Sequence, residues 1–457
     1  MTNPHADKIA AHLARVAPFD TLSPLQLRAL SRSIRIDRFA EGDQILRRGA
    51  PGHEMYIIAS GHVSVPVREN SGTLKFEAHL PPGQCLGELA LLTGSPRSAD
   101  AFASTQCMLL AVPRDAVLAL LDSAPHVAAY LTELLGDRLL ENDGIRTVGQ
   151  YSLFRRIGRG GMSLVFEGRQ RSLDRPVAVK MLSHQLVYRR NFAERFRNEA
   201  KIIAGLRHPH IVQVFDMVEA YATFFIVMEM LEGEDLSRII KHKPMAPAEV
   251  RRILGQVARA LEYAHSLGVI HRDLKPSNVR VLPDGSSKLM DFGLAWVQRF
   301  ENSLVEDEDI VLGTPYYMSP EQAQGLELDH RTDIYNFGVL AFEMLTGERP
   351  FAGQSKSEVQ RRHVEDAPPD PRSMVDSVPT DLLELIDKCM KKDPADRFSS
   401  CGEIVAFLSA KGTTGRLHVE NFRVMYEVGA ADDVEHAISE LRQAIALIPG
   451  AEFGGSL

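Results

Sequence analysis

The feature that most constrains this chain is a polar string, His271-Arg272-Asp273-Leu274-Lys275-Pro276-Ser277-Asn278, followed by a second string, Asp291-Phe292-Gly293. Between them, Pro283-Asp284-Gly285 has the composition of a tight turn and predicts one short hairpin. Around this pair the pattern changes from strand-like runs before residue 235 to long amphipathic helical runs after it, such as residues 248–267. Strands followed by helices predict an α+β unit with two lobes over residues 151–408.

Two features upstream suggest a bound phosphate. The glycine-rich run Gly158-Arg159-Gly160-Gly161-Met162-Ser163-Leu164-Val165 follows strand-like residues, and glycines let backbone amides approach phosphate oxygens without an intervening Cβ. By itself this run is more often a simple tight turn. Val177-Ala178-Val179-Lys180 has the pattern of a buried strand that ends in one lysine, whose charge needs a partner. Glu199 is the best available partner, and the alternative is a surface lysine with a solvated glutamate.

Together these strings resemble the protein kinase family, and those at residues 158–165 and 271–278 are most similar to bacterial serine/threonine kinases. Three more matching strings follow in the family's order: Gly313-Thr314-Pro315-Tyr316-Tyr317-Met318-Ser319-Pro320-Glu321, Asp333-Ile334-Tyr335-Asn336-Phe337-Gly338 and Asp393-Pro394-Ala395-Asp396-Arg397. The resemblance implies a bilobal kinase fold and Mg²⁺-dependent transfer of the ATP γ-phosphate to serine or threonine hydroxyls of protein substrates.

The resemblance also implies a role for each matching residue. Asp273 accepts the proton of the substrate hydroxyl, Lys275 lies on the γ-phosphate, and Thr314 bridges the two. Lys180, held by Glu199, binds the α- and β-phosphates. Asn278 and Asp291 hold Mg²⁺ through oxygen ligands, which suit that hard cation. The expected nucleotide contacts are Ile157, Gly158, Gly160, Gly161, Val165, Ala178, Lys180, Met228, Glu229, Leu231, Asp235, Asn278 and Asp291.

Some motif residues are expected to be structural. His271 and Phe292 are expected to pack together, and Glu321 with Arg397 to form a buried ion pair that braces the C-lobe. One residue departs from the family pattern: Arg280 stands where many relatives have an apolar residue beneath the adenine. Either its aliphatic stem forms that floor or the strand is shifted.

A second informative string lies in the N-terminal third, where short strand-like runs alternate with glycine and proline: Gly87-Glu88-Leu89-Ala90-Leu91-Leu92-Thr93-Gly94-Ser95-Pro96-Arg97-Ser98-Ala99. Free amides at a helix start attract an anion, and a guanidinium holds phosphate oxygens in a bidentate manner. A carboxylate suits sugar hydroxyls instead. The combination describes a pocket for a sugar phosphate.

This string resembles the phosphate-binding segment of cyclic-nucleotide-binding domains, which implies a β-roll with flanking helices over residues 19–146. By that resemblance Glu88 binds the ribose 2′-hydroxyl and Arg97 the cyclic phosphate of cyclic AMP or cyclic GMP. Further contacts are expected from Gly87, Leu89, Ala90 and Ser98. The alternative is that Arg97 and Glu88 pair with each other in a domain that binds nothing.

Composition sets the remaining limits on the 457 residues. A net charge of −8 argues against nucleic-acid and acidic-membrane partners, and four distant cysteines fit a reducing compartment. The beginning of the chain shows no signal peptide and no apolar run approaches ~20 residues, so we expect a cytoplasmic protein. Residues 1–18 are predicted to be an N-terminal tail and 409–457 a C-terminal helical tail. A homodimer is left open.

The sequence therefore predicts a serine/threonine kinase regulated in cis by a cyclic nucleotide. Two alternatives remain: a pseudokinase scaffold that carries a sensor, and an active kinase whose sensor domain is only structural. The predicted helix that contains Val127, Leu131, Leu134, Leu135 and Leu139 runs almost directly into the strand at Tyr151. We expect this helix to connect the two domains mechanically.

Overall fold

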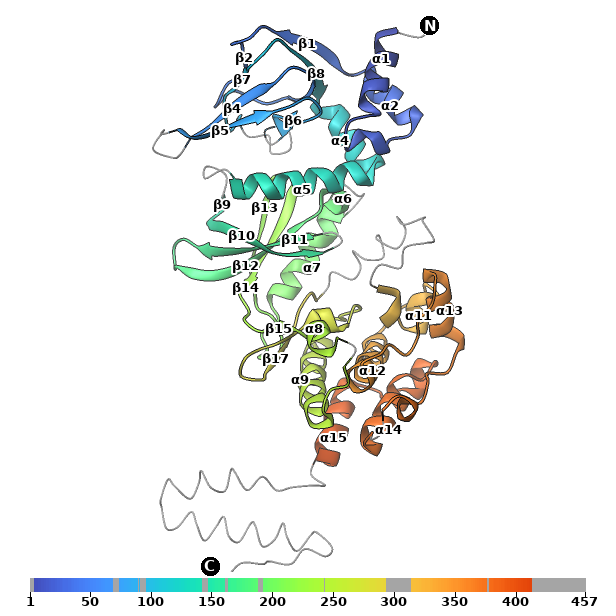
Figure 1. The fold of residues 1–457 in the computed structure, drawn as a ribbon. Helices are drawn as coiled ribbons and strands as arrows, with labels where there is room; N and C mark the ends of the chain where they lie inside the picture. Colours follow the sequence, from blue (N-terminus) through green and yellow to red (C-terminus); the bar gives the residue numbers. More distant parts are fainter. Residues whose placement is uncertain are drawn as a thin grey trace, which may run out of the picture.

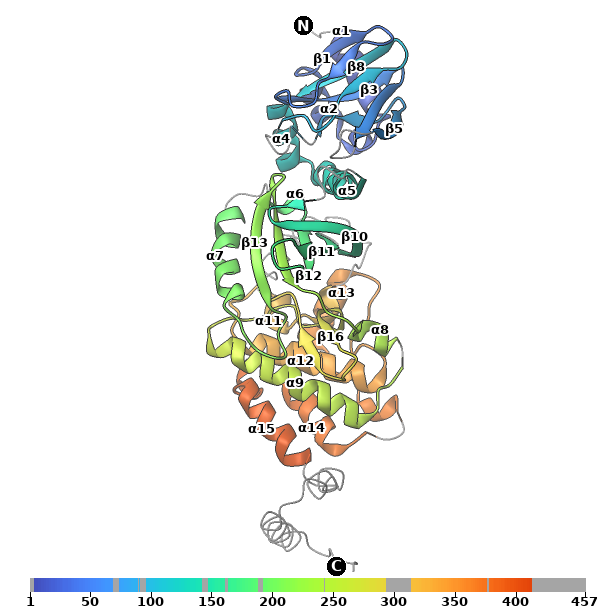
Figure 2. The same ribbon diagram turned by 90° about the vertical axis from the view of Figure 1, so that its left-hand side faces the viewer.

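The computed structural model describes residues 4–68, 74–88, 90, 96–141, 147–160, 163–187, 192–241, 243–292, 314–375 and 378–412. Three parts follow one another along the molecule: an N-terminal β domain, a sheet-rich lobe and a helical lobe (Figures 1 and 2). The predicted fold class, a β-roll with flanking helices followed by a bilobal α+β unit, is confirmed. Within the described ranges, no helix combines the length and apolar character required to cross a bilayer.

The N-terminal domain consists of two facing antiparallel sheets with the strand orders β1-β8-β3-β6 and β2-β7-β4-β5. Alternate residues of the central strands serve two cores: Ile58 and Leu109 lie between the sheets, whereas Ile57 and Leu110 pack against helices. The strands are β1 (Arg35–Phe39), β2 (Gln44–Leu46), β3 (Glu54–Ser60), β4 (Val63–Arg68), β5 (Leu74–Leu80), β6 (Cys85–Leu86), β7 (Ala101–Ala103) and β8 (Cys107–Pro113).

Helices cover the outer face of the first sheet. They are α1 (Pro4–Leu13), α2 (Pro24–Ser31), α4 (Arg114–Ser123) and α5 (Pro125–Glu141). The segment predicted to be an N-terminal tail instead contains α1, whose Ile9 and Leu13 are buried in the same core as α2. Their i, i+4 spacing places both side chains on one helix face, a short signal that sequence analysis passed over. Residues 1–18 are thus largely part of the sensor domain.

The sheet-rich lobe has one six-stranded antiparallel sheet with the order β13-β14-β12-β11-β10-β9. Its strands are β9 (Thr147–Val148), β10 (Tyr151–Gly160), β11 (Ser163–Gln170), β12 (Arg175–Leu182), β13 (Val214–Ala220) and β14 (Thr223–Glu229). Helix α6 (His184–Val187) and helix α7 (Phe192–Ala204) connect β12 to β13. Helix α5 of the N-terminal domain lies across this sheet in both views (Figures 1 and 2).

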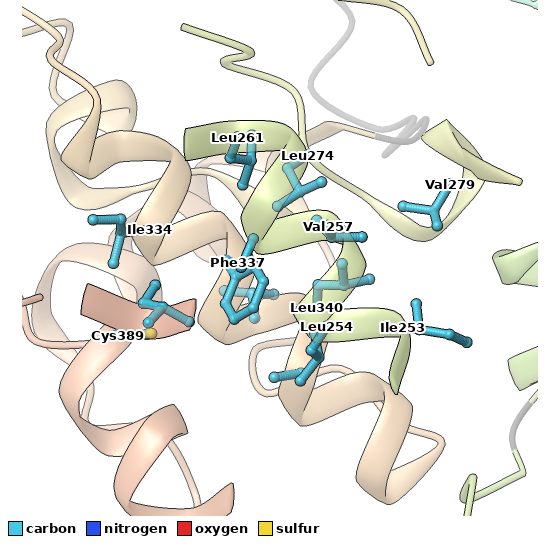
Figure 3. Close-up of a cluster of buried hydrophobic side chains, with 14 of the residues drawn as sticks. Ile253, Leu254, Val257, Leu261, Leu274, Val279, Ile334, Phe337, Leu340 and Cys389 are labelled. Carbon is cyan, nitrogen blue, oxygen red and sulfur yellow. The ribbon is translucent and has the colours of Figure 1, made fainter. Parts of the chain in front are cut away.

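The helical lobe is built on α9 (Pro247–Ser266) and α12 (Arg331–Thr346), which cross in its centre. Val257, Leu261, Phe337 and Leu340 are fully buried there, together with Cys389 at the end of α14 (Thr380–Cys389) (Figure 3). The other helices are α8 (Leu236–Ile240), α11 (Pro320–Ala323), α13 (Lys356–Glu365), α14 (Thr380–Cys389) and α15 (Cys401–Gly412). The predicted C-terminal helix at residues 432–447 lies outside the described residues.

A small sheet, β15-β16-β17, closes the helical lobe on the side of the cleft. It consists of β15 (Glu234–Asp235), β16 (Val279–Val281) and β17 (Ser287–Leu289). The predicted hairpin is confirmed, since β16 and β17 pair antiparallel through a turn that contains Gly285 with φ of 81°. This hairpin joins the two polar strings that dominate the sequence.

Candidate active site and sensor pocket

An apolar cluster of residues from both lobes lies where adenine was predicted to bind. Ala178 and Met228, which face each other across β12 and β14, form one buried cluster with Val212. Val165 and Leu231 pack against this cluster, as do Ile226, Met230 and Met290. The structure thus brings together four predicted adenine contacts, Val165, Ala178, Met228 and Leu231. Gly158 and Gly160 lie at the end of β10, whereas Gly161 is outside the described residues.

The loop after α9 brings together two predicted catalytic residues, Asp273 and Lys275, and the predicted magnesium ligand Asn278. Lys275 Nζ lies 2.7 Å from Asp273 Oδ2, and Asn278 Nδ2 donates to the same oxygen at 2.9 Å. Asn278 also donates to the backbone carbonyl of Asp273 at 2.8 Å. This bond fixes the loop to the short 3-10 helix of residues 276–278. Because the amide nitrogen of Asn278 faces Asp273, its carbonyl oxygen remains available as a ligand.

Lys180 lies near the end of the central strand β12 and makes an ion pair with Asp291, Nζ to Oδ1 at 2.8 Å. Burial raises the pKa of Asp291, but the charge and hydrogen bond of Lys180, with Lys275 and His271 nearby, bring it below the usual value. The carboxylate is therefore ionised at neutral pH. Glu199, the predicted partner of Lys180, lies half-buried on α7. Its pairing with Lys180 stays a prediction, and the side chain of Thr314 lies outside the described residues.

A residue that sequence analysis left without a role organises the catalytic loop. Asp333 of α12 is fully buried and accepts hydrogen bonds from the backbone amides of His271 at 2.8 Å and Arg272 at 2.7 Å. His265 Nε2 lies 2.7 Å from the same carboxylate. These bonds stabilise Arg272 at a φ of 65°, a conformation that is costly for a residue with a side chain. The available signal was an aspartate directly before an apolar-rich run of the helix, since a buried carboxylate must have partners.

The residues expected to be structural behave as predicted. Arg397 makes two hydrogen bonds to Glu321, at 2.8 and 2.9 Å, and both side chains are buried. The rings of His271 and Phe292 pack edge to face with centroids 4.7 Å apart. These contacts hold the site together without presenting a reactive group to a substrate.

Arg280 is placed by a regular strand rather than a shifted one. Residues Val279, Arg280 and Val281 pair in unbroken register with β17. The Nη1 atom of Arg280 lies 2.7 Å from Oδ1 of Asp235, its neighbour across β15 and β16. Neither of the two explanations offered from the sequence included this ion pair.

In the sensor pocket, the two residues predicted to bind nucleotide have separate partners. Arg97 donates from Nη1 to the carbonyl of Gly87 at 2.7 Å and from Nη2 to the carbonyl of Glu54 at 2.6 Å. Glu88 makes its ion pair with Arg138 of α5, Nε to Oε1 at 3.5 Å. The interpretation in which Arg97 and Glu88 pair with each other is therefore not supported.

Both charges of this pocket are poorly solvated. Arg97 is 7% exposed and Glu88 4% exposed, and the Oε2 atom of Glu88 is buried without a hydrogen-bond partner among the described residues. Burial raises the pKa of Glu88 and lowers that of Arg97. Ala90 is buried and Ser98 is exposed beside them, and Leu89 lies outside the described residues.

Helix α5 belongs to both domains at once. Its first half contributes Val127 and Leu131 to the core of the sensor, and its second half contributes Leu135 and Leu139 to the core of the sheet-rich lobe. The sequence predicted one helix that contains these residues and runs into the strand at Tyr151. The packing divides them between two partners, so the helix cannot move relative to one domain without disturbing a core.

A buried polar contact adds to this junction. The hydroxyl of Thr132 on α5 lies 3.0 Å from Nδ1 of His184 and 3.3 Å from the hydroxyl of Ser183, and it accepts from the amide of His184 at 3.0 Å. Burial lowers the pKa of His184 to about 4, so the ring is neutral at physiological pH. Ser183 and His184 directly follow the strand that carries Lys180.

Comparison with known families agrees with this geometry. Residues 151–407 match the model of the protein kinase domain, which is more than half of the chain. The chain belongs to the protein kinase family. Residues 36–124 match the model of the cyclic nucleotide-binding domain.

Similar proteins include several bacterial kinases. A probable serine/threonine-protein kinase of Clostridium perfringens is 40% identical over 260 residues, which is 57% of this chain and 38% of that protein. The kinase PrkC of Bacillus subtilis is 34% identical over 282 residues, 62% of this chain and 43% of PrkC. The chain thus spans about two fifths of the length of these relatives. The crystal structure of the PknI kinase domain of Mycobacterium tuberculosis is 27% identical, with a TM-score of 0.48, and covers 58% of this chain and 97% of that domain.

Proposed function

We propose that the chain is an ATP-dependent protein kinase that phosphorylates serine or threonine hydroxyls. The observation that carries this proposal is the convergence of Asp273, Lys275 and Asn278 in one loop, together with the ion pair that joins Lys180 of the sheet-rich lobe to Asp291, which follows β17 of the helical lobe. A pseudokinase typically lacks one of these groups, and the chain retains all of them. Phosphoryl transfer requires mainly alignment and compensation of phosphate charge, and these side chains supply both.

In this proposal Asp273 orients the substrate hydroxyl and takes its proton, and Lys275 beside it neutralises charge on the transferred phosphate. The apolar cluster that contains Ala178, Val165 and Met228 lines the adenine site. The backbone groups of Glu229 and Leu231 bind the edge of the adenine ring. Ile157, Gly158, Gly160 and Gly161 are expected to cover the nucleotide phosphates, and Asp235 is expected to bind the ribose. Glu199 is expected to support Lys180, and Thr314 is expected to support Lys275.

The residues present fit magnesium. Among the described residues, no three His, Cys, Asp or Glu side chains lie close enough to hold a metal ion alone. Magnesium commonly uses one or two carboxylate or amide oxygens and completes its coordination with phosphate and water. The free oxygens of Asn278 and Asp291 are such ligands. When bound, the ion compensates phosphate charge, while Lys180 holds Asp291 in the orientation that the ion needs.

The kinase proposal is tested by incubating the purified chain with γ-labelled ATP, Mg²⁺ and a serine- and threonine-containing protein such as casein. Label on casein or on the chain itself is expected with Mg²⁺ and not with EDTA. The absence of label at every Mg²⁺ concentration would favour the pseudokinase alternative.

For the N-terminal domain we propose binding of a cyclic purine nucleotide, with cyclic AMP slightly preferred over cyclic GMP. The proposal is supported by two buried charges that do not neutralise each other: Arg97 for the cyclic phosphate and the open Oε2 of Glu88 for the ribose 2′-hydroxyl. Gly87, Leu89, Ala90 and Ser98 would line the phosphate. A cyclic phosphate would give Arg97 an anionic partner in place of neutral carbonyls. Calorimetry with each nucleotide tests this, and no heat with either one contradicts it.

We further propose that α5 transmits this binding event to the kinase site. Arg138 on α5 holds Glu88, so a nucleotide that takes Glu88 changes the contacts of the helix. On the same helix, Thr132 contacts Ser183 and His184. These two residues begin the connection from β12, which carries Lys180, to α7, which carries Glu199. A displacement of α5 would therefore reach both residues. The available energy is the differential affinity of the nucleotide for two arrangements, typically ~1–3 kcal/mol.

The natural substrate is proposed to be a protein that presents serine or threonine in an accessible segment. A cytoplasmic location remains a prediction from the composition, and so does the absence of nucleic-acid and membrane partners. The homodimer also remains open and would be tested by sedimentation of the purified chain.

A further inference from the structure

Arg280 occupies a place in the nucleotide cleft that its two neighbours do not share. Val279 is fully buried in the helical core and Val281 packs against that core. Because side chains alternate along a strand, Arg280 projects to the opposite side of β16, towards β15. There its guanidinium meets Asp235, the residue proposed to bind the ribose.

The carboxylate of Asp235 is held away from the position that it would otherwise take. Asp235 is the residue before the first turn of α8, where an aspartate normally accepts a hydrogen bond from a helix amide. Its side chain makes no such bond, and its Oδ1 atom accepts from Arg280 at 2.7 Å instead. The carboxylate of Asp235 thus bonds the guanidinium of Arg280 rather than an amide at the start of α8, because a charged donor makes the stronger hydrogen bond.

The contact leaves room for a ligand. It joins one guanidinium nitrogen, Nη1, to one carboxylate oxygen, Oδ1, so the acceptor capacity of Oδ2 is not used by this pair. The Asp235 side chain is 27% exposed, so it remains accessible to a ligand. A hydroxyl donor can therefore bind Oδ2 while Arg280 keeps Oδ1.

Lys288 is a second cation on the same hairpin, and it contacts Glu229, the residue at which the segment that ends at Asp235 begins. Lys288, which faces Arg280 across β16 and β17, places its Nζ 2.6 Å from Oε1 of Glu229. Glu229 and Asp235 delimit the segment whose backbone is proposed to bind adenine. The hairpin therefore holds both ends of the segment, and Arg280 holds the end next to the ribose.

We propose that Arg280 is a positioning residue that determines recognition of the ribose of ATP, by holding Asp235 towards the ribose hydroxyls and away from the start of α8. This inference rests on the proposed nucleotide-binding function. It accounts for a charged residue at a position where an apolar floor was expected. Without Arg280, Asp235 is expected to turn to the amides of α8, and the ribose loses its acceptor.

The test is calorimetry of the full chain with Mg²⁺ and the β,γ-imido analogue of ATP, compared with the 2′-deoxy form of that analogue. Arg280→Met is expected to weaken binding of the ribose form about fivefold, the usual effect of one such hydrogen bond, and to leave binding of the deoxy form within about twofold. Arg280→Lys, which keeps a cation near Asp235, is expected to retain most of the preference. In an Asp235→Ala background, Arg280→Met should add nothing.

A matched control is Arg251→Met, because Arg251 has the same 28% side-chain exposure and pairs with Asp381 far from the cleft. It should not change the ratio of the two affinities. Equal weakening of both analogues by Arg280→Met, or tighter binding of the ribose form, would overturn the proposal. Binding is measured without phosphate transfer, so a chain that binds with this preference but transfers no phosphate would contradict the proposed kinase function and not this inference.

Discussion

The two candidate sites differ in how their charges are compensated. In the kinase cleft, Lys180 lies on Asp291 and Lys275 on Asp273, each pair within 2.8 Å. In the sensor pocket, the partners of Arg97 among the described residues are neutral carbonyls and Glu88 has a long ion pair with Arg138, although both are more deeply buried than Lys180. The cleft is thus electrostatically satisfied before a ligand binds, whereas the pocket holds two charges that a ligand would stabilise.

This difference indicates different tasks. Preformed pairs keep the catalytic groups ionised and oriented, as the lowered pKa of Asp291 shows. Poorly solvated charges give a ligand a large gain in free energy on binding, since the cost of their burial is already met by the fold. Such a pocket suits a sensor.

The largest effect is expected in the kinase cleft. Asp291→Asn and Lys180→Met each remove a charge that complements the polyphosphate, and phosphate transfer should fall by several orders of magnitude. Rates of label incorporation from γ-labelled ATP measure this. Lys388→Met, which removes a lysine paired with Glu403 in the helical lobe, should leave the rate nearly unchanged. Undiminished transfer in either cleft variant would contradict the assignment of the site.

The next effect is expected in the sensor. Arg97→Ala removes the guanidinium that would pair with the cyclic phosphate, and such a loss is on the order of 2–5 kcal/mol, or at least ~30-fold in affinity. Calorimetry with cyclic AMP and cyclic GMP measures it. Arg35→Ala serves as the control, because Arg35 is 61% exposed on the same domain and pairs with Asp37 and Glu54. If the Arg97 and Arg35 variants bind the cyclic nucleotides with equal affinity, the domain has only a structural role.

A smaller effect is expected at the junction. Thr132→Val removes the hydroxyl that contacts Ser183 and His184 and should reduce the response of kinase activity to cyclic nucleotide, whose full size is ~5- to 150-fold. Thr346→Val is a matched control, since both threonines bond the carbonyl four residues earlier in a helix and only Thr132 contacts another domain. An equal loss of response in both variants would show that stability, not the contact, is responsible.

The smallest effect concerns acid stability. The pKa of buried His184 is about 4, below the ~6.5 of an unfolded histidine, so its contribution to stability is present above pH 6.5 and is lost as pH falls towards 4. Between pH 7 and 5.5 this amounts to about 1 kcal/mol. His363, with a pKa also near 4, behaves in the same way. His184→Gln should therefore reduce, not abolish, the acid sensitivity seen in urea unfolding. The same pH dependence in both proteins would contradict the buried, neutral state of His184.

The sequence predicted the kinase cleft better than the sensor junction for a physical reason. The cleft is built from short strings, so that Asp273, Lys275 and Asn278 are neighbours in the chain and their meeting is local. Arg138 and Glu88 are fifty residues apart, and no motif in the sequence indicates that they pair. The role of Asp333 was missed for the same reason, because its partners are backbone amides, which no residue type identifies.

The packing of the helices shows a similar limit. The spacing of apolar residues predicted the helix around residues 127–139 correctly. Periodicity shows that a face is buried and does not show what buries it, so the division of α5 between Leu131 in one core and Leu135 in another could not be foreseen. Helix α1 was overlooked because only two of its buried residues, Ile9 and Leu13, have large apolar side chains, which is a weak signal within ten residues.

The central claim is that α5 couples the two sites, and reciprocity of binding tests it most directly. The affinity of the full chain for cyclic AMP should be measured by calorimetry with and without saturating Mg²⁺ and the β,γ-imido analogue of ATP, and the converse titration should follow. The account predicts that each ligand changes the affinity of the other by the same factor, between ~5 and 150, and that a flexible Gly/Ser insertion at Gly144 brings this factor to one while both ligands still bind. Cyclic AMP affinities that are identical with and without the ATP analogue in the unmodified chain would contradict it.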